Sequence, residues 1–147
     1  MTYRPWMPRL LALAGALILG GLSSAPAMAQ DAAKFPVELN RLEQDGPICR
    51  VYLVANNPAE SAIKAFKLDL VFFDKNDIIR NRLYVELGPL IPRKTAVRLF
   101  DMPETDCSVI GSILVNDVVS CSSADGQAMN CLARLELSSK ADIPLRY

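Results

Sequence analysis

The four cysteines of this 147-residue chain are the side chains that could carry chemistry, and their number and spacing indicate which chemistry that is. They are Cys49, Cys107, Cys121 and Cys131, and cysteine can bind metal, exchange disulfides or form structural bridges. No two of them form a C-x-x-C pair, and histidine, the usual companion of cysteine in zinc sites, does not occur in the chain. Four cysteines without these companions predict two disulfides and no metal site, with three pairings open.

The segment between Cys121 and Cys131, SSADGQAMN, is polar and turn-forming, which favours a local bridge between these two residues. Cys49 would then pair with Cys107 and join distant parts of the chain. A local bridge that is exposed and strained can be exchanged with other thiols. A thiol-redox helper that uses Cys121 and Cys131 is therefore an alternative to a purely structural role.

The absence of histidine also limits catalysis. Neither a Ser-His-Asp nor a Cys-His device can be built within this chain. Carboxylates that could work as an acid–base pair are Asp69, Asp74, Asp77, Glu86, Asp101, Glu104, Asp106 and Asp117. Most of them lie in predicted turns, where acidic residues are common. Asp69 and Asp117 lie inside strand-like runs and are expected to be simply exposed or hydrogen-bonded, with Asp69 able to face solvent opposite the core side chains. We predict no catalytic residues, no cofactor and no enzymatic activity.

Asp74 and Asp77 raise the question of an ion site, because both lie in the segment DKND between two apolar runs. A calcium loop needs more oxygen ligands at fixed intervals and a glycine at its tight turn. This segment has three side-chain donors and no glycine. Asp and Asn favour tight turns because their side chains can bond to the local backbone. The segment therefore predicts a hairpin turn.

Basic residues are concentrated in one stretch of the chain, and they define the predicted partner surface. This surface comprises the 73–82 hairpin and the 92–98 segment, with the side chains of Phe73, Arg80, Arg82, Arg93, Lys94 and Arg98. Apolar and cationic side chains together suit an acidic protein or an anionic lipid headgroup. We expect that changing Arg80, Arg82 and Arg98 to Glu abolishes partner capture and leaves the melting temperature unaltered.

Residues 1–29 have the pattern of a cleaved secretory signal peptide. Arg4 and Arg9 form a positive start, residues 10–22 are apolar, and Ala27-Met28-Ala29 is a small-residue cleavage site. No adjacent arginine pair precedes the apolar run, which favours the general secretory route. Residues 30–147 are then expected to form a single domain in the periplasm.

The charge balance excludes some classes of partner. The chain carries 16 basic and 16 acidic residues, and 14 basic residues remain once Arg4 and Arg9 are removed. This balance gives no indication of nucleic-acid binding. After residue 29 no apolar run reaches the about 20 residues that cross a bilayer, so we expect no transmembrane segment after signal cleavage.

The part of the chain after the signal alternates strand-like runs with turns. The runs are 37–42, 49–55, 65–73, 78–87, 95–100, 109–119 and 132–138. Short strands at this spacing predict an all-β, immunoglobulin-like β-sandwich of about seven strands, stapled by the two disulfides. In the third run, alternation places Phe66, Leu68, Leu70 and Phe72 on the core side.

The block "AFKLDLVFFDKNDIIRNRLYVELGPLIPRKTAVRLFD", residues 65–101, resembles the FxLYD-type, immunoglobulin-like domains of bacterial exported proteins. With "CRVYLVANN", "IGSILVNDVVSC" and the four cysteines, the chain also resembles small proteobacterial exported proteins labelled Tat-pathway signal proteins, whose function is unknown. The resemblance implies a β-sandwich without enzymatic activity.

These observations lead to one predicted function and two alternatives. We predict a periplasmic, non-enzymatic interaction or assembly module whose partner is an unknown periplasmic protein, with envelope-associated proteins among the candidates. The alternatives are the redox helper that uses Cys121 and Cys131, and a carrier that holds a small ligand in the sandwich interior.

Overall fold

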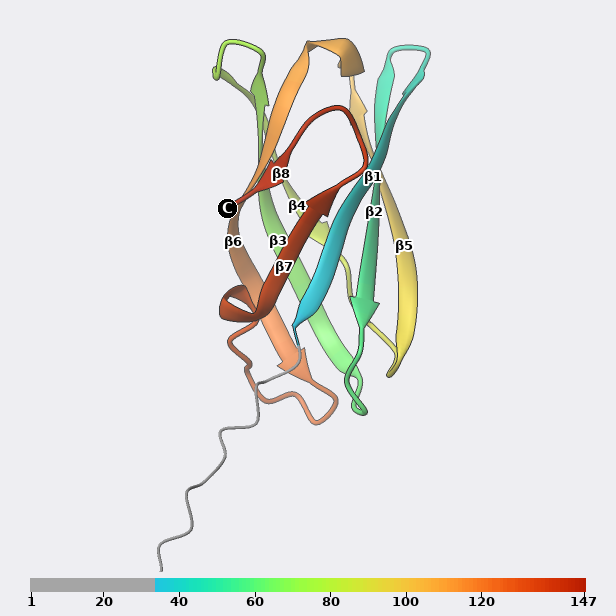
Figure 1. The fold of residues 1–147 in the computed structure, drawn as a ribbon, viewed down its shortest axis with the longest axis vertical. Helices are drawn as coiled ribbons and strands as arrows, with labels where there is room; N and C mark the ends of the chain where they lie inside the picture. Colours follow the sequence, from blue (N-terminus) through green and yellow to red (C-terminus); the bar gives the residue numbers. More distant parts are fainter. Residues whose placement is uncertain (1–33) are drawn as a thin grey trace, which may run out of the picture. The chain divides into compact units, whose positions relative to one another are not determined.

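The computed structural model describes residues 34–147, and the predicted signal peptide lies outside them. Alternating apolar and polar residues form eight β-strands in the described part of the chain (Figure 1). The strands are β1 Phe35–Asp45, β2 Ile48–Asn57, β3 Ile63–Asp74, β4 Ile79–Glu86, β5 Lys94–Pro103, β6 Ile110–Ser123, β7 Leu135–Ser139 and β8 Leu145–Arg146. Two short 3-10 turns, η1 Cys107–Val109 and η2 Leu132–Arg134, precede β6 and β7.

The strands form two four-stranded sheets, ordered β5-β2-β1-β7 and β4-β3-β6-β8. Neighbouring strands pair antiparallel except β1 with β7 and β6 with β8, which are parallel. Immunoglobulin-like sandwiches place the first, second and fifth strands in one sheet and the third and sixth in the other, as this chain does. The predicted all-β sandwich with two disulfides is therefore confirmed.

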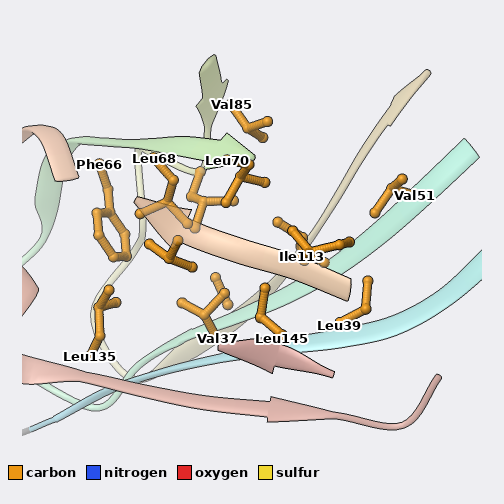
Figure 2. Close-up of a cluster of buried hydrophobic side chains, with 14 of the residues drawn as sticks. Val37, Leu39, Val51, Phe66, Leu68, Leu70, Val85, Ile113, Leu135 and Leu145 are labelled. Atoms are coloured by element: carbon orange, nitrogen blue, oxygen red, sulfur yellow. The ribbon is translucent and has the colours of Figure 1, made fainter. Parts of the chain in front are cut away.

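The inner faces of the two sheets form the core, and β3 contributes more of its largest side chains than any other strand (Figure 2). Phe66, Leu68, Leu70 and Phe72 are fully buried, as their alternation predicted. Phe66 meets Phe35 of the opposite sheet, with ring centroids 6.0 Å apart in a tilted arrangement that aromatic pairs favour. Contacts of this kind hold the two sheets together.

Two local predictions differ from the structure. The described residues form eight strands rather than about seven, because β8 has only two residues and no alternation that could predict it. The predicted strands at 109–119 and 132–138 begin later than expected, after η1 and η2.

Both predicted disulfides are present with the favoured pairing. Cys49–Cys107 joins β2 to η1 across a sequence separation of 58, and Cys121–Cys131 joins the end of β6 to the residue before η2 across a separation of 10. Two disulfides fit an oxidising location outside the cytoplasm. Within residues 34–147, no helix has the length and apolar character that crossing a bilayer requires.

The Cys49–Cys107 bridge should stabilise the fold more than the Cys121–Cys131 bridge, because it closes the longer loop. The chain-entropy relation gives about 4.2 kcal/mol for the long loop and about 2.7 kcal/mol for the short one. We expect Cys49→Ala/Cys107→Ala to lower the free energy of unfolding in urea by about 1.5 kcal/mol more than Cys121→Ala/Cys131→Ala does. If Cys121→Ala/Cys131→Ala were the less stable variant, loop length would not be the origin of the difference between the two bridges.

Candidate interaction surface

The structure separates the residues of the predicted partner surface into two groups. Phe73, Arg80 and Arg82 lie on the β3–β4 hairpin, whereas Arg93, Lys94 and Arg98 lie just before β5 or on it. Arg80 binds Asp74, where β3 ends, and the Arg93 amide donates to the Ala59 carbonyl, just before β3 begins. The length of β3 puts roughly 30 Å between these two points. The basic residues therefore do not form one patch.

Arg82 binds a buried carboxylate on the neighbouring strand. Its Nε and Nη2 atoms donate to the two carboxylate oxygens of Asp69 at 2.8 and 2.6 Å, and the Asn116 side-chain amide donates to the same carboxylate at 2.6 Å. Asp69 is only 1% exposed, so of the two expected roles, exposed or hydrogen-bonded, the structure shows the hydrogen-bonded one. Hydrogen bonds from Arg82, the largest influence, and from Asn116 lower the pKa of Asp69 below its ordinary value of 3.8 despite its burial.

Asp74 organises the turn that the sequence predicted between β3 and β4. One carboxylate oxygen accepts from the backbone N–H groups of Asn76 and Ile78 at 2.8 and 3.0 Å, and the other accepts from Arg80 Nε at 2.8 Å. These bonds lower the pKa of Asp74, the one from Ile78 most. Gly111 of β6 lies against this turn, where a Cβ atom would be 2.6 Å from the Asp74 carbonyl oxygen. The Asp74 carboxylate therefore stabilises the turn between β3 and β4.

Two further members of the predicted surface are engaged with neighbouring groups. The Arg146 guanidinium lies 5.3 Å from the ring centroid of Phe73, which is half-buried. Arg98, also half-buried, donates to the Pro89 carbonyl at 3.1 Å. Lys94 is exposed at the start of β5. The arginines of this region are thus largely used to hold the fold together.

Exposed apolar side chains are concentrated on β4, β5 and the segments beside them. Of the ten large apolar side chains exposed in the described part of the chain, six lie between residues 78 and 99: Ile78, Ile79, Tyr84, Ile91, Val97 and Leu99. Val97 and Leu99 on β5 are 58% and 57% exposed, and they lie opposite Val54 and Tyr52 of β2 on the outer face of the sheet. We call these four residues the β5 surface.

The β5 surface has a charged rim. Arg50 donates to both carboxylate oxygens of Asp101 at 2.7 and 2.9 Å, and the Arg41 guanidinium lies 4.4 Å from the Tyr52 ring centroid. An exposed apolar group with polar residues around it is typical of protein interaction sites. The sequence predicts a partner surface on the basic residues, and the side chains of the β5 surface lie outside that prediction, although Val97 and Leu99 lie between Lys94 and Asp101 in the sequence.

A hollow of about 500 Å³ beside η1 is a second feature. Its lining includes apolar Leu42, Ile110 and Ile143 and cationic Arg41, Lys75 and Lys140. Two of these cations already pair with carboxylates, Arg41 with Glu43 and Lys140 with Glu38. The lining residues come from β1, from η1 and the start of β6, and from the segment between β7 and β8.

Comparisons with known proteins leave the function to be argued from these surfaces. No protein-family model matches the chain, and searches among curated proteins and among solved structures return no match. The resemblance to FxLYD-type domains therefore stays a prediction.

The two groups of arginines should respond differently to charge reversal. Arg82→Glu would place a carboxylate beside buried Asp69, so we expect the melting temperature to fall by roughly 10 °C. Arg93→Glu is the matched control, because Arg93 pairs with Glu60 and both side chains are exposed. Exposed ion pairs contribute little to the free energy of unfolding. Equal melting temperatures for the two variants would show that the Asp69–Arg82 pair does not stabilise the fold, and they would agree with the sequence-based prediction that changing Arg82 leaves the melting temperature unaltered.

The lowered pKa of Asp69 predicts a pH-dependent contribution to stability. Because the folded-state pKa lies below the ordinary value of 3.8, the native state binds fewer protons than the unfolded state in this range. The contribution is fully present above about pH 4 and is lost as the pH falls through the folded-state pKa. We expect urea unfolding of Asp69→Asn to depend less steeply on pH between about 4 and 2 than unfolding of the parent protein. If the free energies of unfolding of Asp69→Asn and the parent protein changed equally with pH, Asp69 would not be the source of this contribution.

Proposed function

We propose that this protein is an exported, non-enzymatic interaction module of the periplasm that contacts a partner protein through the β5 surface. The observation that carries the proposal is the exposure of Val97 and Leu99 on an edge strand beside half-buried Tyr52 and Val54. Burial of apolar area is the main favourable term in most protein association, so exposed apolar side chains at a sheet edge favour a binding role.

The export part of the proposal rests on two independent features. Residues 1–29 carry the charge, apolar run and cleavage pattern of a secretory signal. The Cys49–Cys107 and Cys121–Cys131 bridges fit an oxidising compartment.

The two alternatives have less support. A redox helper needs a bridge that a partner thiolate can reach, and Cys121 and Cys131 are both buried. A ligand carrier would use the hollow beside η1, but two of the three cations in its lining are already paired. A binding role at the β5 surface needs no rearrangement of the fold.

A photocrosslinking amino acid at Leu99 tests the proposal in intact cells of the native host. We expect it to link the protein to a partner, whereas the same group at Val119, which is also half-exposed but lies on β6, should not. Adding Val97→Lys should reduce the Leu99 product about tenfold or more, because it removes apolar area from the contact. Equal products at Leu99 and Val119, or no effect of Val97→Lys, would contradict the proposal.

A further inference from the structure

Arg98 carries a positive charge that no carboxylate neutralises in the described part of the chain. Six other arginines of residues 34–147 pair with carboxylates, and these are Arg41, Arg50, Arg80, Arg82, Arg93 and Arg146. Arg98 instead donates to two uncharged groups, the carbonyls of Pro89 and Val97, at 3.1 and 3.2 Å. A guanidinium has five N–H groups and these bonds use two, so three remain for a ligand.

Arg98 and Lys94 line the same hollow, which lies between β5 and the segment that follows β4. Its volume is about 230 Å³. Its lining consists of Pro89, Ile91, Lys94, Thr95, Ala96 and Arg98. Lys94 is exposed, and it too has no ion pair among residues 34–147. Alternation places Lys94 and Arg98 on the opposite side of β5 from Val97 and Leu99, so the hollow is separate from the β5 surface.

The carboxylates of the strands beside the hollow are already bound. β4 and β5 contain one carboxylate each, Glu86 and Asp101. Glu86 accepts from two backbone N–H groups at 3.0 and 3.1 Å, and Asp101 is bound by Arg50. The lining of the hollow contains no acidic residue. Two cations therefore face one hollow without a counter-charge, and an anion between them would replace their mutual repulsion with attraction.

We propose that this hollow is a binding site for a phosphate group, held by Lys94 and Arg98. The two side chains supply two positive charges, which match the charge of about −1.5 to −2 on a phosphate monoester near pH 7. A carboxylate has one negative charge and would leave one cation uncompensated. The guanidinium can bond to two phosphate oxygens at once, and the ammonium group of Lys94 acts as a point charge.

The size and the walls of the hollow indicate how the rest of the ligand lies. Its volume of about 230 Å³ is below the about 300–1,000 Å³ of sites that enclose drug-sized molecules, so it holds one such group. Ile91, which is 57% exposed, supplies an apolar wall together with Pro89. The part of the ligand attached to the phosphate would lie outside the hollow against Ile91. A soluble phosphate ester and a lipid headgroup share this chemistry.

Titration of the exported protein with inorganic phosphate, with both disulfides intact, tests the site. The experiment follows the backbone amide signals by NMR at constant ionic strength. We expect phosphate to shift the signals of Thr95, Ala96 and Arg98 until the site is saturated. Lys94→Gln and Arg98→Gln should each raise the dissociation constant about tenfold or more, because each removes a charge-assisted hydrogen bond.

Arg93→Gln is the matched control. It removes the same charge from the residue next to Lys94, but Arg93 pairs with Glu60 and does not line the hollow. Its dissociation constant should therefore differ less than about twofold from that of the parent protein. Acetate, the carboxylate probe, should bind at least about tenfold more weakly than phosphate. Lys94 has no side-chain hydrogen bond within residues 34–147, so Lys94→Gln decides the outcome if Arg98→Gln does not fold.

Three results would overturn the inference. They are an unchanged dissociation constant in Lys94→Gln, equal losses of affinity in Lys94→Gln and Arg93→Gln, and acetate binding as tight as that of phosphate. The hollow lies outside the β5 surface, so these results and those of the Leu99 crosslinking experiment are independent of each other.

Vesicles distinguish the two sources of the phosphate group. Phosphatidylcholine vesicles that contain phosphatidic acid present a phosphate monoester, whereas vesicles of phosphatidylcholine alone do not. Sedimentation of the parent protein with the first kind, but not of Lys94→Gln, would support the site and identify a lipid headgroup. Phosphate binding without vesicle binding would support the site and identify a soluble ester. No response to phosphate in either form would overturn the inference.

Discussion

The structure depends on burying both faces of β3. Its inner face supplies Phe66, Leu68, Leu70 and Phe72 to the core, and its outer face carries Asp69, which is also buried. A buried carboxylate is stable only when it is paired and hydrogen-bonded, and Arg82 and Asn116 meet that need. Arg80 and Arg82 of the β3–β4 hairpin therefore bind carboxylates of the buried strand β3, whereas Val97 and Leu99 of the β5 surface stay exposed.

The fold was predictable because its determinants are local. Period-two alternation indicates which side chains of β3 face inward, and the Asp and Asn residues after it indicate a turn. Both disulfides followed from an even cysteine count and from the polar segment between Cys121 and Cys131. β8 could not be predicted, because its two residues are ordered by pairing with β6, a contact that no local pattern encodes.

The candidate surface was not predictable, because it depends on which strands lie at sheet edges. Alternation put Val97 and Leu99 on one side of the fifth run and Arg98 and Phe100 on the other, and both sides contain an apolar residue. Phe100 packs toward Phe72, with ring centroids 6.2 Å apart, so Val97 and Leu99 face outward. The burial of Asp69 could not be predicted either, because a charged residue in a strand ordinarily lies on the solvent side. The residues that bind its carboxylate, Arg82 and Asn116, are 13 and 47 positions away in the sequence.

The parallel pairing of β1 with β7 and of β6 with β8 constrains the order in which the domain can form. Ribosomes and membrane channels both deliver a chain from its amino end. β1 and β6 must then wait with one side unpaired until the last dozen residues arrive, and contacts this distant in sequence are slow to form. The nascent protein would be vulnerable to aggregation and proteolysis during that interval, and it would benefit from a holding chaperone until its carboxyl end is released.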